Sequence, residues 1–274
     1  APQSFMKHAV SNIALTAFDH RHELMELREL GITGVEIAPS RIWHNTWTEL
    51  KASDVTAYRN DIEIAGLEVV GLHSLFFDHP ELGLFKGPET DAQSMLFLEH
   101  LSAVCRDLGG KTLIYGGGRK RGDMPLVQAY AQAYAFFSEL CTRIENHGTC
   151  FCFEPLGPND TDFINSALES LAIVKDISHP ALRVQLDAKA LYENNEAVSV
   201  IFQAVSDELV HFHANEPGLN TLGHSGVIDH QFLGQMLRDI NYDEYISIEQ
   251  RMLNDDNPLA DIKVSIAVLR ENYA

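Results

Sequence analysis

Short runs of apolar and β-branched residues recur along the chain, separated by longer segments in which apolar positions are spaced three or four apart. Runs of this length and alternation are typical of buried strands. Eight of them cover residues 8–15, 34–40, 68–77, 112–118, 149–156, 182–191, 209–216 and 244–252. The pattern therefore predicts eight strands in succession.

The segments between the strands include amphipathic helices with recognisable ends. Residues 19–31 end at Gly31, residues 91–110 end in a glycine pair, and residues 125–148 begin with Pro125 and end with Gly148. Proline in the first turn and glycine after the last turn are typical helix boundaries. Strands that alternate with helices predict an α/β protein with a parallel sheet.

Eight strand–helix units in 274 residues predict a (β/α)8 TIM barrel that forms a single domain over residues 1–274. A doubly wound sheet is the alternative, and it would need a glycine-rich phosphate turn after the first strand. The sequence there, NIALTAFDHRHE, contains no glycine. The barrel is therefore the preferred fold class.

The chain is acidic, with 39 Asp and Glu against 20 Lys and Arg and a net charge of −19. Nucleic-acid and anionic membrane surfaces are bound through basic patches. The only dense basic cluster is Arg119, Lys120 and Arg121. We therefore expect a small-molecule ligand, with neither nucleic acid nor a membrane as partner. A homo-oligomer is left open.

The four cysteines, Cys105, Cys141, Cys150 and Cys152, form no CxxC pair and no zinc-ligand spacing. The first residues, APQSFMKHAV, lack the charged and apolar regions of a secretory signal, and no apolar run reaches the length of a membrane span. These features predict a cytoplasmic protein with reduced thiols.

Polar residues stand at the predicted C-terminal ends of the strands, where TIM barrels carry their active sites. Alternate strand positions share one face. The residues that this alternation directs into the barrel mouth are Glu36, His73, Glu154, Asp187, His211, His213 and Glu249. We expect these side chains to gather at one end of the barrel.

Four of these residues, Glu154, Asp187, His213 and Glu249, come one each from the fifth to the eighth strand. Each alone could be a solvated loop residue or a hydrogen-bonded core histidine. Three carboxylates in one mouth would repel each other unless a cation lay between them. Together they predict a site for one divalent ion, Mn²⁺, Mg²⁺ or Co²⁺, with Zn²⁺ also accommodated.

Other residues near the mouth have weaker signals. His73 is a metal or substrate contact or a strand-end cap, and Glu36 is a structural hydrogen-bonding acid. Lys189 points inward if its strand runs that far. Trp43 and Trp47 either wall a sugar pocket or anchor their loop. The run GGGRKR, residues 116–121, could hold a phosphate, although a flexible loop is the preferred interpretation.

Several segments resemble the xylose-isomerase-like TIM-barrel superfamily of sugar phosphate isomerases and epimerases, in particular ketose 3-epimerases, hydroxypyruvate isomerase and inosose dehydratase. The resemblance covers nearly the whole chain in strand order. The segments that carry it are FEPLGPNDTDFINS (153–166), VQLDAKAL (184–191), HFHANEPG (211–218), GHSGVIDHQFLGQML (223–237) and YDEYISIEQR (242–251).

The resemblance implies a metal-dependent sugar isomerase or epimerase. The residues matching Glu154, Asp187, His213 and Glu249 would bind one divalent metal. Glu154 and Glu249 would also act as acid and base through a cis-enediolate. Substrate contacts are assigned to His73, Asp160, His211, Glu216, Arg251, Trp43 and Lys189.

The sequence departs from the epimerase pattern at three substrate positions. The histidine three residues after the metal aspartate is Ala190, and the arginine six residues after the metal histidine is Leu219. The acid six residues after the first metal glutamate is the shorter Asp160. The metal and acid–base residues are therefore retained, whereas the substrate-polarising residues are not.

Three other functions are weighed against isomerisation. Dehydration of a keto-polyol would use the same enediolate. An apurinic endonuclease would need further histidines, but the fourth strand ends in YGGG and only Asp229-His230 resembles the expected Asp-x-His pair. A non-catalytic sugar-binding barrel would show neither bound metal nor turnover.

Overall fold

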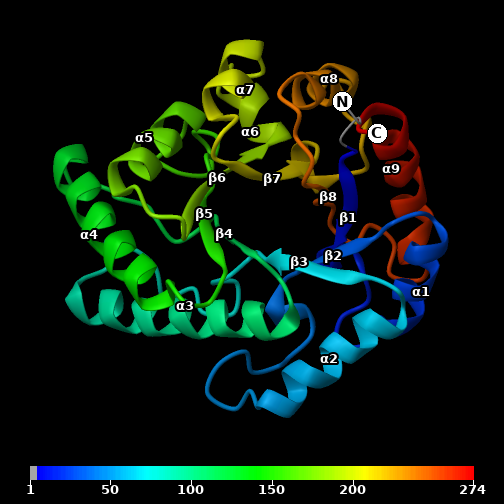
Figure 1. The fold of residues 1–274 in the computed structure, drawn as a ribbon, viewed down its shortest axis with the longest axis horizontal. Helices are drawn as coiled ribbons and strands as arrows, with labels where there is room; N and C mark the ends of the chain where they lie inside the picture. Colours follow the sequence, from blue (N-terminus) through cyan, green and yellow to red (C-terminus); the bar gives the residue numbers. More distant parts are fainter. Residues whose placement is uncertain (1–4) are drawn as a thin grey trace.

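The computed structural model describes residues 5–274, which form a closed barrel of eight parallel strands in the order β1 to β8 (Figure 1). This is a (β/α)8 TIM barrel, as the sequence predicts. The strands are β1 Lys7–Ser11, β2 Gly34–Ile37, β3 Glu68–Leu72, β4 Thr112–Tyr115, β5 Cys150–Phe153, β6 Leu182–Asp187, β7 Leu209–Ala214 and β8 Tyr245–Ile248.

The helices lie outside the strands as a surrounding layer (Figure 1). They are α1 Arg21–Glu29, α2 Ala52–Ile64, α3 Pro88–Leu108, α4 Leu126–Ile144, α5 Ala167–Ile177, α6 Ala188–Glu193, α7 Ser199–Val205, α8 His230–Asp239 and α9 Pro258–Asn272. Short 3-10 turns follow three of the strands at Asn12–Ala14, Pro39–Arg41 and Pro217–Leu219.

The predicted strand runs are longer than the strands themselves because apolar residues continue into the loops. The run 68–77 is an example, since β3 ends at Leu72. Beyond that point Phe76 packs against Phe97 of α3 and Tyr115 of β4, with ring centroids 6.1 and 5.4 Å apart. Hydrophobic periodicity reports burial, so it does not separate a strand residue from a buried loop residue.

The fifth strand shows how the alternation places the site. Phe153 points to the helical layer and lies 5.0 Å from Phe137 of α4 between ring centroids. Cys152, one residue earlier, is fully buried on the other side of the strand. Glu154 shares the side of Cys152, so the strand delivers its carboxylate to the mouth of the barrel.

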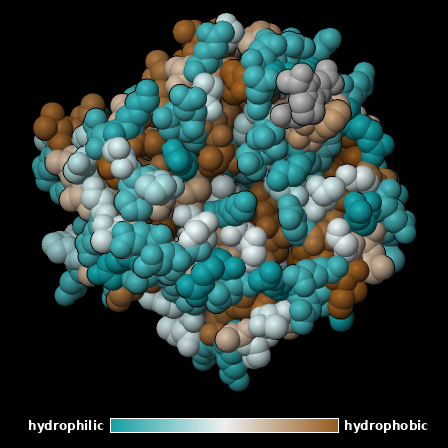
Figure 2. All heavy atoms as spheres, viewed as in Figure 1, coloured by the Kyte–Doolittle hydropathy of each residue, from teal (hydrophilic) through white to brown (hydrophobic). Residues whose placement is uncertain are grey.

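Hydrophilic residues cover most of the face shown in Figure 2, and hydrophobic residues are scattered over it in small areas. All four cysteines are free thiols. Within residues 5–274, no helix is both long enough and apolar enough to cross a membrane.

Candidate active site

The four predicted metal ligands meet at the C-terminal ends of β5 to β8. Glu154 directly follows β5, Asp187 ends β6, His213 lies near the end of β7, and Glu249 directly follows β8. One ligand atom from each lies within 4.8 Å of those of the others. We call these four residues the ligand cluster.

Asn215 holds two carboxylates of the ligand cluster in place. Its side-chain amide donates to Asp187 Oδ2 over 2.6 Å and to Glu249 Oε1 over 2.9 Å. The other oxygen of Asp187 accepts the backbone N–H of Ala190 over 2.9 Å at the start of α6. Sequence reasoning missed Asn215, although its position two residues after His213 was a signal.

His213 lies at the centre of the cluster and is fully buried. Its Nδ1 lies 3.6 Å from Glu154 Oε1, 3.8 Å from Asp187 Oδ2 and 3.6 Å from Glu249 Oε2. No hydrogen bond to this nitrogen is formed within the described part of the chain. Buried nitrogens normally have a hydrogen-bond partner. The three carboxylates lie too far from Nδ1 to serve as one, so this nitrogen is left without a partner.

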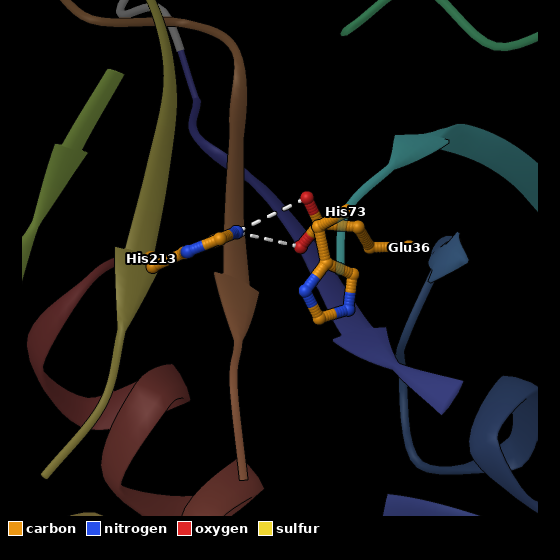
Figure 3. Close-up of side chains that lie close together, drawn as sticks. All are labelled: Glu36, His73 and His213. Carbon is orange, nitrogen blue, oxygen red and sulfur yellow. Dashed lines mark hydrogen bonds and ion pairs between the residues drawn. The ribbon is translucent and has the colours of Figure 1, made fainter. Parts of the chain in front are cut away.

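The second ring nitrogen of His213 is engaged on the opposite side. Nε2 lies 2.8 and 3.1 Å from the two carboxylate oxygens of Glu36 (Figure 3). Ser247 Oγ also donates to Glu36 over 2.9 Å, and His211 Nε2 lies 2.9 Å from it. A carboxylate behind a metal-binding imidazole fixes the tautomer that leaves the other nitrogen free.

Glu36, His73 and His213 also approach each other closely enough to share an ion (Figure 3). Glu36 is already the acceptor for His213 and Ser247, so it acts as the structural acid that the sequence predicts. Burial opposes its ionisation, but His211 and His213 outweigh burial and hold the pKa of Glu36 well below its usual value. The carboxylate of Glu36 is therefore ionised.

The two glutamates of the cluster have different proton affinities. Burial is the main cause that raises the pKa of Glu154 to about 7, and Asp187 and Glu249 add to it. Burial acts the same way on Glu249, but His213 and hydrogen bonds from His73 and Asn215 lower its pKa to about 2. Pairs of carboxyl groups with separated pKa values are suited to acid–base roles.

His73 supports Glu249 from the end of β3. Its Nδ1 lies 3.5 Å from Glu249 Oε2, and its Nε2 lies 2.5 Å from the hydroxyl of the buried Ser11. Sequence reasoning placed His73 in the mouth but did not find Ser11, because a serine at the end of β1 carries no distinguishing signal.

A cavity of about 870 Å³ opens above the ligand cluster. Three predicted substrate residues, His73, Asp160 and Lys189, line it. Lys189 Nζ lies 3.0 Å from Asp160 and 2.8 Å from Glu193. A smaller cavity of about 410 Å³ lies at the opposite end of the barrel, around Lys7, Lys111 and Arg183.

The other four predicted substrate residues do not line the cavity; they are His211, Glu216, Arg251 and Trp43. His211 is buried beneath it beside Glu36. The carboxylate of Glu216 instead binds the loop before α8, where it accepts the backbone N–H groups of Gly223 and Ser225 over 2.9 and 3.1 Å. Arg251 is exposed and donates to the carbonyl oxygen of Gly218 over 3.1 Å.

The tryptophans anchor their loop. Trp43 lies edge-on to Tyr58 of α2, with ring centroids 6.0 Å apart, and Trp47 packs 4.9 Å from Phe97 of α3. Both are partly buried against the core and contribute nothing to the lining of the cavity. The sequence left open whether they wall a sugar pocket or anchor their loop, and these contacts are those of loop anchors.

The glycine-rich run lines the cavity from Gly116 to Lys120. A Cβ on Gly116 would lie 2.8 Å from Glu154 Oε2, so glycine leaves room for that carboxylate. Arg119 is buried and donates to the carbonyl oxygens of Tyr115 and Ile164 over 3.2 and 2.9 Å. This side chain anchors the run, in place of the flexible loop that was preferred.

The chain belongs to the xylose isomerase-like TIM barrel family, whose profile matches residues 24–272. The family predicted from the sequence is therefore confirmed. Since the match begins in α1 and ends in α9, it includes all four residues of the ligand cluster.

The curated relatives are epimerases, which are isomerases. The chain is 26% identical to the D-psicose 3-epimerase of Agrobacterium fabrum over 135 residues, 49% of this chain and 46% of that protein. It therefore spans less than half of that relative. It is 23% identical to the fructoselysine 3-epimerase of Escherichia coli O157:H7 over 233 residues, 83% of this chain and 84% of that protein.

Solved structures share the fold. A 3-keto-D-glucoside 4-epimerase from E. coli has a TM-score of 0.81 at 19% identity, over 97% of this chain and 99% of the other. A probable 3-DHS dehydratase from Bacillus anthracis has a TM-score of 0.76 at 16% identity, over 97% and 99% of the two chains. At these identities the likeness concerns the fold alone.

Proposed function

We propose that this chain is a divalent-metal-dependent isomerase or epimerase of a small ketose or a related polyol carbonyl compound. The observation that carries the proposal is the buried Nδ1 of His213, which has no hydrogen-bond partner among the described residues and faces three carboxylates. The relatives that are named as sugar 3-epimerases support the same reaction class.

The residues present fit a divalent ion. Glu154, Asp187, His213 and Glu249 would hold it, and three oxygen donors with one nitrogen suit Mn²⁺, Mg²⁺ or Co²⁺. Bound there, the ion would supply Lewis-acid polarisation of a substrate oxygen. Asn215 and Glu36 would orient Asp187 and His213, the first through its amide and the second through Nε2.

Glu154 and Glu249 are the acid–base pair in this proposal. They come from β5 and β8, so they flank His213 from two sides of the mouth. One takes the proton from the carbon next to the carbonyl group, and the resulting enediolate accepts a proton from the other or from the same glutamate. Return to the opposite face gives an epimer, and return to the neighbouring carbon gives an isomer.

Dehydration of a keto-polyol is the second candidate. Ala190 and Leu219 line the cavity at the positions where the epimerase pattern has histidine and arginine. These two side chains cannot polarise a substrate hydroxyl, so the site differs from an epimerase where the substrate's oxygens bind. The structural likeness to a probable dehydratase supports keeping this reaction in the test.

A DNA-repair function has little support from the geometry. Within residues 5–274, the side chains that could hold a metal form two groups, and these share His213. A site for several ions would need further ligands beyond these two overlapping groups, even where one carboxylate bridges two ions. A small-molecule sugar is accordingly the proposed substrate.

The test is solvent exchange at carbon. Protein supplied with Mn²⁺ is incubated in deuterated water with a panel of ketoses, aldoses and their acids, and NMR records loss of the proton next to the carbonyl group. Exchange with formation of an isomer or epimer is expected. Formation of an enone instead identifies the dehydratase. No exchange with any compound, in protein shown to contain metal, contradicts both candidates.

A further inference from the structure

The smaller cavity, of about 410 Å³, opens at the N-terminal end of the barrel, opposite the ligand cluster. Its lining includes residues at the starts of β1, β3, β4, β5, β6 and β8, so it enters the barrel from below. TIM barrels are normally filled by layers of bulky side chains. The volume of this cavity is in the range of small-molecule sites, so this end of the barrel has room for a ligand.

A row of small residues leaves this space open. Gly71, Thr112 and Cys150 lie side by side across β3, β4 and β5 in the sheet register. Cys150 comes two residues before Cys152, so strand alternation directs its side chain to the inside of the barrel. The apolar residues near this end form a small cluster that is separate from the main core, and they are Ala9, Val70 and Tyr245. The row therefore leaves the room that a bulky layer would fill.

Cys150 is the accessible thiol of the chain. It is partly exposed and lines the cavity, whereas Cys105, Cys141 and Cys152 are buried. A thiol that reacts must be reached by its reagent, and buried thiols are inert for that reason. A molecule in the cavity can therefore meet Cys150 and none of the other three cysteines.

Two cationic residues flank Cys150. Lys111 directly precedes β4, and its carbonyl oxygen accepts the backbone N–H of Cys150 over 2.8 Å. Arg183 lies on β6, in register with Cys152. Both residues line the cavity, and among residues 5–274 neither side chain forms an ion pair. The strands on both sides of Cys150 thus each bring one positive charge to the cavity.

The other titratable side chains with which the cavity is lined are engaged with one another. They are Lys7 with Glu244 at 3.7 Å, Glu68 with the hydroxyl of Tyr245 at 2.6 Å, and His179 with Glu145 at 3.9 Å. Lys111 and Arg183 are therefore the charges that remain for a ligand. Lysine and arginine side chains favour carboxylate groups.

The pKa of the Cys150 thiol is held below its usual value. A hydrogen bond with the thiol of Cys152 is the largest cause, and the charges of Arg183 and Lys111 act in the same direction, while burial and Glu244 oppose them. A lower pKa increases the share of thiolate at neutral pH, and the thiolate is the form that attacks disulfides.

An unpaired hydroxyl lies next to Cys150. Thr112 is only 5% exposed, and its Oγ1 forms no hydrogen bond within the part of the chain that the structure describes. Thr112 is the register neighbour of Cys150 on β4 and lines the same cavity. Buried hydroxyl groups normally have a partner. This hydroxyl is therefore available to a polar atom of a molecule bound beside Cys150.

We propose that Cys150 is a covalent modification site, at which the thiolate forms a mixed disulfide with a small disulfide that carries carboxylate groups. Lys111 and Arg183 attract the carboxylates, and the Thr112 hydroxyl is a further hydrogen-bonding group beside the new bond. The Cys150 sulfur attacks one sulfur of the incoming disulfide, the bond between its two sulfurs breaks, and the other half leaves as a thiolate. The incoming disulfide is itself the oxidant, so no further co-reactant is needed.

The site lies at the opposite end of the barrel from the ligand cluster. Its test uses neither a sugar nor a metal-dependent reaction. The outcome is therefore independent of the proposed isomerase activity.

The experiment compares two disulfides of opposite charge. The full chain is incubated at neutral pH with glutathione disulfide, which is anionic, or with cystamine, which is cationic, and mass spectrometry measures the rate and the position of the adduct. A neutral cysteine derivative in solution gives the reference ratio of the two rates. Relative to it, the protein should favour glutathione disulfide about tenfold or more, because two positive charges attract one reagent and repel the other. Peptide mapping should find one glutathionyl group, on Cys150.

Variants test the location. Cys150→Ser should abolish the adduct, and Cys141→Ala, at a buried cysteine, should leave it unchanged. Lys111→Gln and Arg183→Gln should each reduce the preference for glutathione disulfide about threefold, the effect of one partly exposed charge. Lys263→Gln, an exposed lysine of α9 outside the cavity, is the matched control and should keep the full preference.

Several results would overturn the proposal. They are the lack of an adduct, an adduct on another cysteine, an internal disulfide between Cys150 and Cys152 in its place, and a ratio of rates equal to that of the reference thiol. A preference that survives in the double variant Lys111→Gln, Arg183→Gln also contradicts it. Circular dichroism checks the folding of each variant, and Lys111→Gln alone decides the role of charge if Arg183→Gln does not fold, since the side chain of Lys111 is exposed.

Discussion

The two sides of the barrel mouth are built differently. On the β5–β8 side, His213 is fully buried, and carboxylates surround it within a network that includes Glu36 and Asn215. On the β3–β4 side, the cavity is lined by loops, and the polar side chains there are Ser74, Lys86, Arg119 and Lys120. Electrostatic positioning of reacting groups needs rigid, desolvated surroundings, whereas recognition of different substrates does not.

The comparison teaches which part of the molecule should be common to several reactions. A cluster in which Asp187, His213 and Glu249 are each held by a further residue would suit epimerases, isomerases and dehydratases alike. Loop residues that do not touch the cluster can change their charge and shape without disturbing it, because loops tolerate substitution better than strands. Gly116 is an exception, since a Cβ there would lie 2.8 Å from Glu154 Oε2. Variants on each side should therefore separate the two contributions.

The largest effect is expected from removing a ligand on the β5–β8 side. The double variant Asp187→Asn, His213→Ala should lower the metal content from about one ion per chain to near zero, since a neutral amide and a methyl group replace a carboxylate and a nitrogen donor. Turnover should be lost with it. Elemental analysis measures the ion, and Asp162→Asn, outside the cavity, is the control. Full metal occupancy in the double variant would show that the ligands are wrongly assigned.

Glu154→Gln and Glu249→Gln should each reduce turnover by about 10²–10⁴ while changing KM little, because a positioned acid or base acts mainly in the transition state. The amide oxygen can still contact the ion, so some metal should remain. The two changes should not be additive. Steady-state kinetics and carbon–proton exchange provide the measurement. Near wild-type exchange in a folded, metal-loaded Glu249→Gln protein would contradict the role of Glu249 as an acid–base residue.

Metal affinity should depend steeply on pH. Glu36 and Glu249 outweigh burial and raise the pKa of His213 well above its usual value, and that of Glu154 is about 7 without metal. A cation must displace both protons below pH 7 but only the histidine proton just above it. As pH is lowered, metal affinity should therefore fall about tenfold per pH unit above pH 7 and about a hundredfold per pH unit below it. Calorimetry at several pH values measures this, and Glu154→Gln should abolish the change in slope.

Glu36→Gln tests the support behind the cluster. The glutamine side chain is neutral and can bond His213 Nε2 less strongly, so the metal should bind about 10–100-fold more weakly, as is common when the partner of a metal-binding imidazole is changed. Ser247→Ala, which removes one neutral hydrogen bond to Glu36, is expected to have a smaller effect. Unchanged metal affinity in Glu36→Gln would show that Glu36 does not act through His213.

Arg119→Met tests the anchoring of the loop after β4. It removes the donors to Tyr115 and Ile164 while retaining an unbranched side chain, and the lost charged hydrogen bonds should lower the free energy of unfolding by about 2 kcal/mol. Lys120→Met, at the neighbouring exposed position, should stay within about 0.5 kcal/mol. Urea denaturation measures both. Equal stabilities of the two variants would mean that Arg119 does not hold the loop.

Sequence reasoning succeeded where a single local pattern carried the information. The alternation of Phe151, Phe153 and Glu154 set the strand and the direction of its terminal acid, and the same logic placed Asp187, His213 and Glu249 at neighbouring strand ends. Strand alternation was wrongly applied to loop residues beyond the strand ends. Glu216 and Arg251 follow β7 and β8 closely, yet their side chains turn to other loops, which strand alternation cannot describe.

What the sequence determined by itself was the number of strand–helix units, the family and the four polar residues that end β5 to β8. Those features depend on local periodicity and on the rule that parallel strands end at one mouth. Only the tertiary structure decided that Asn215, Ser11 and Glu36 support the cluster and that Arg119 is buried. The physical reason is that these contacts join residues far apart in the chain, up to 177 positions for Glu36 and His213, and burial of the pair is set by the whole barrel.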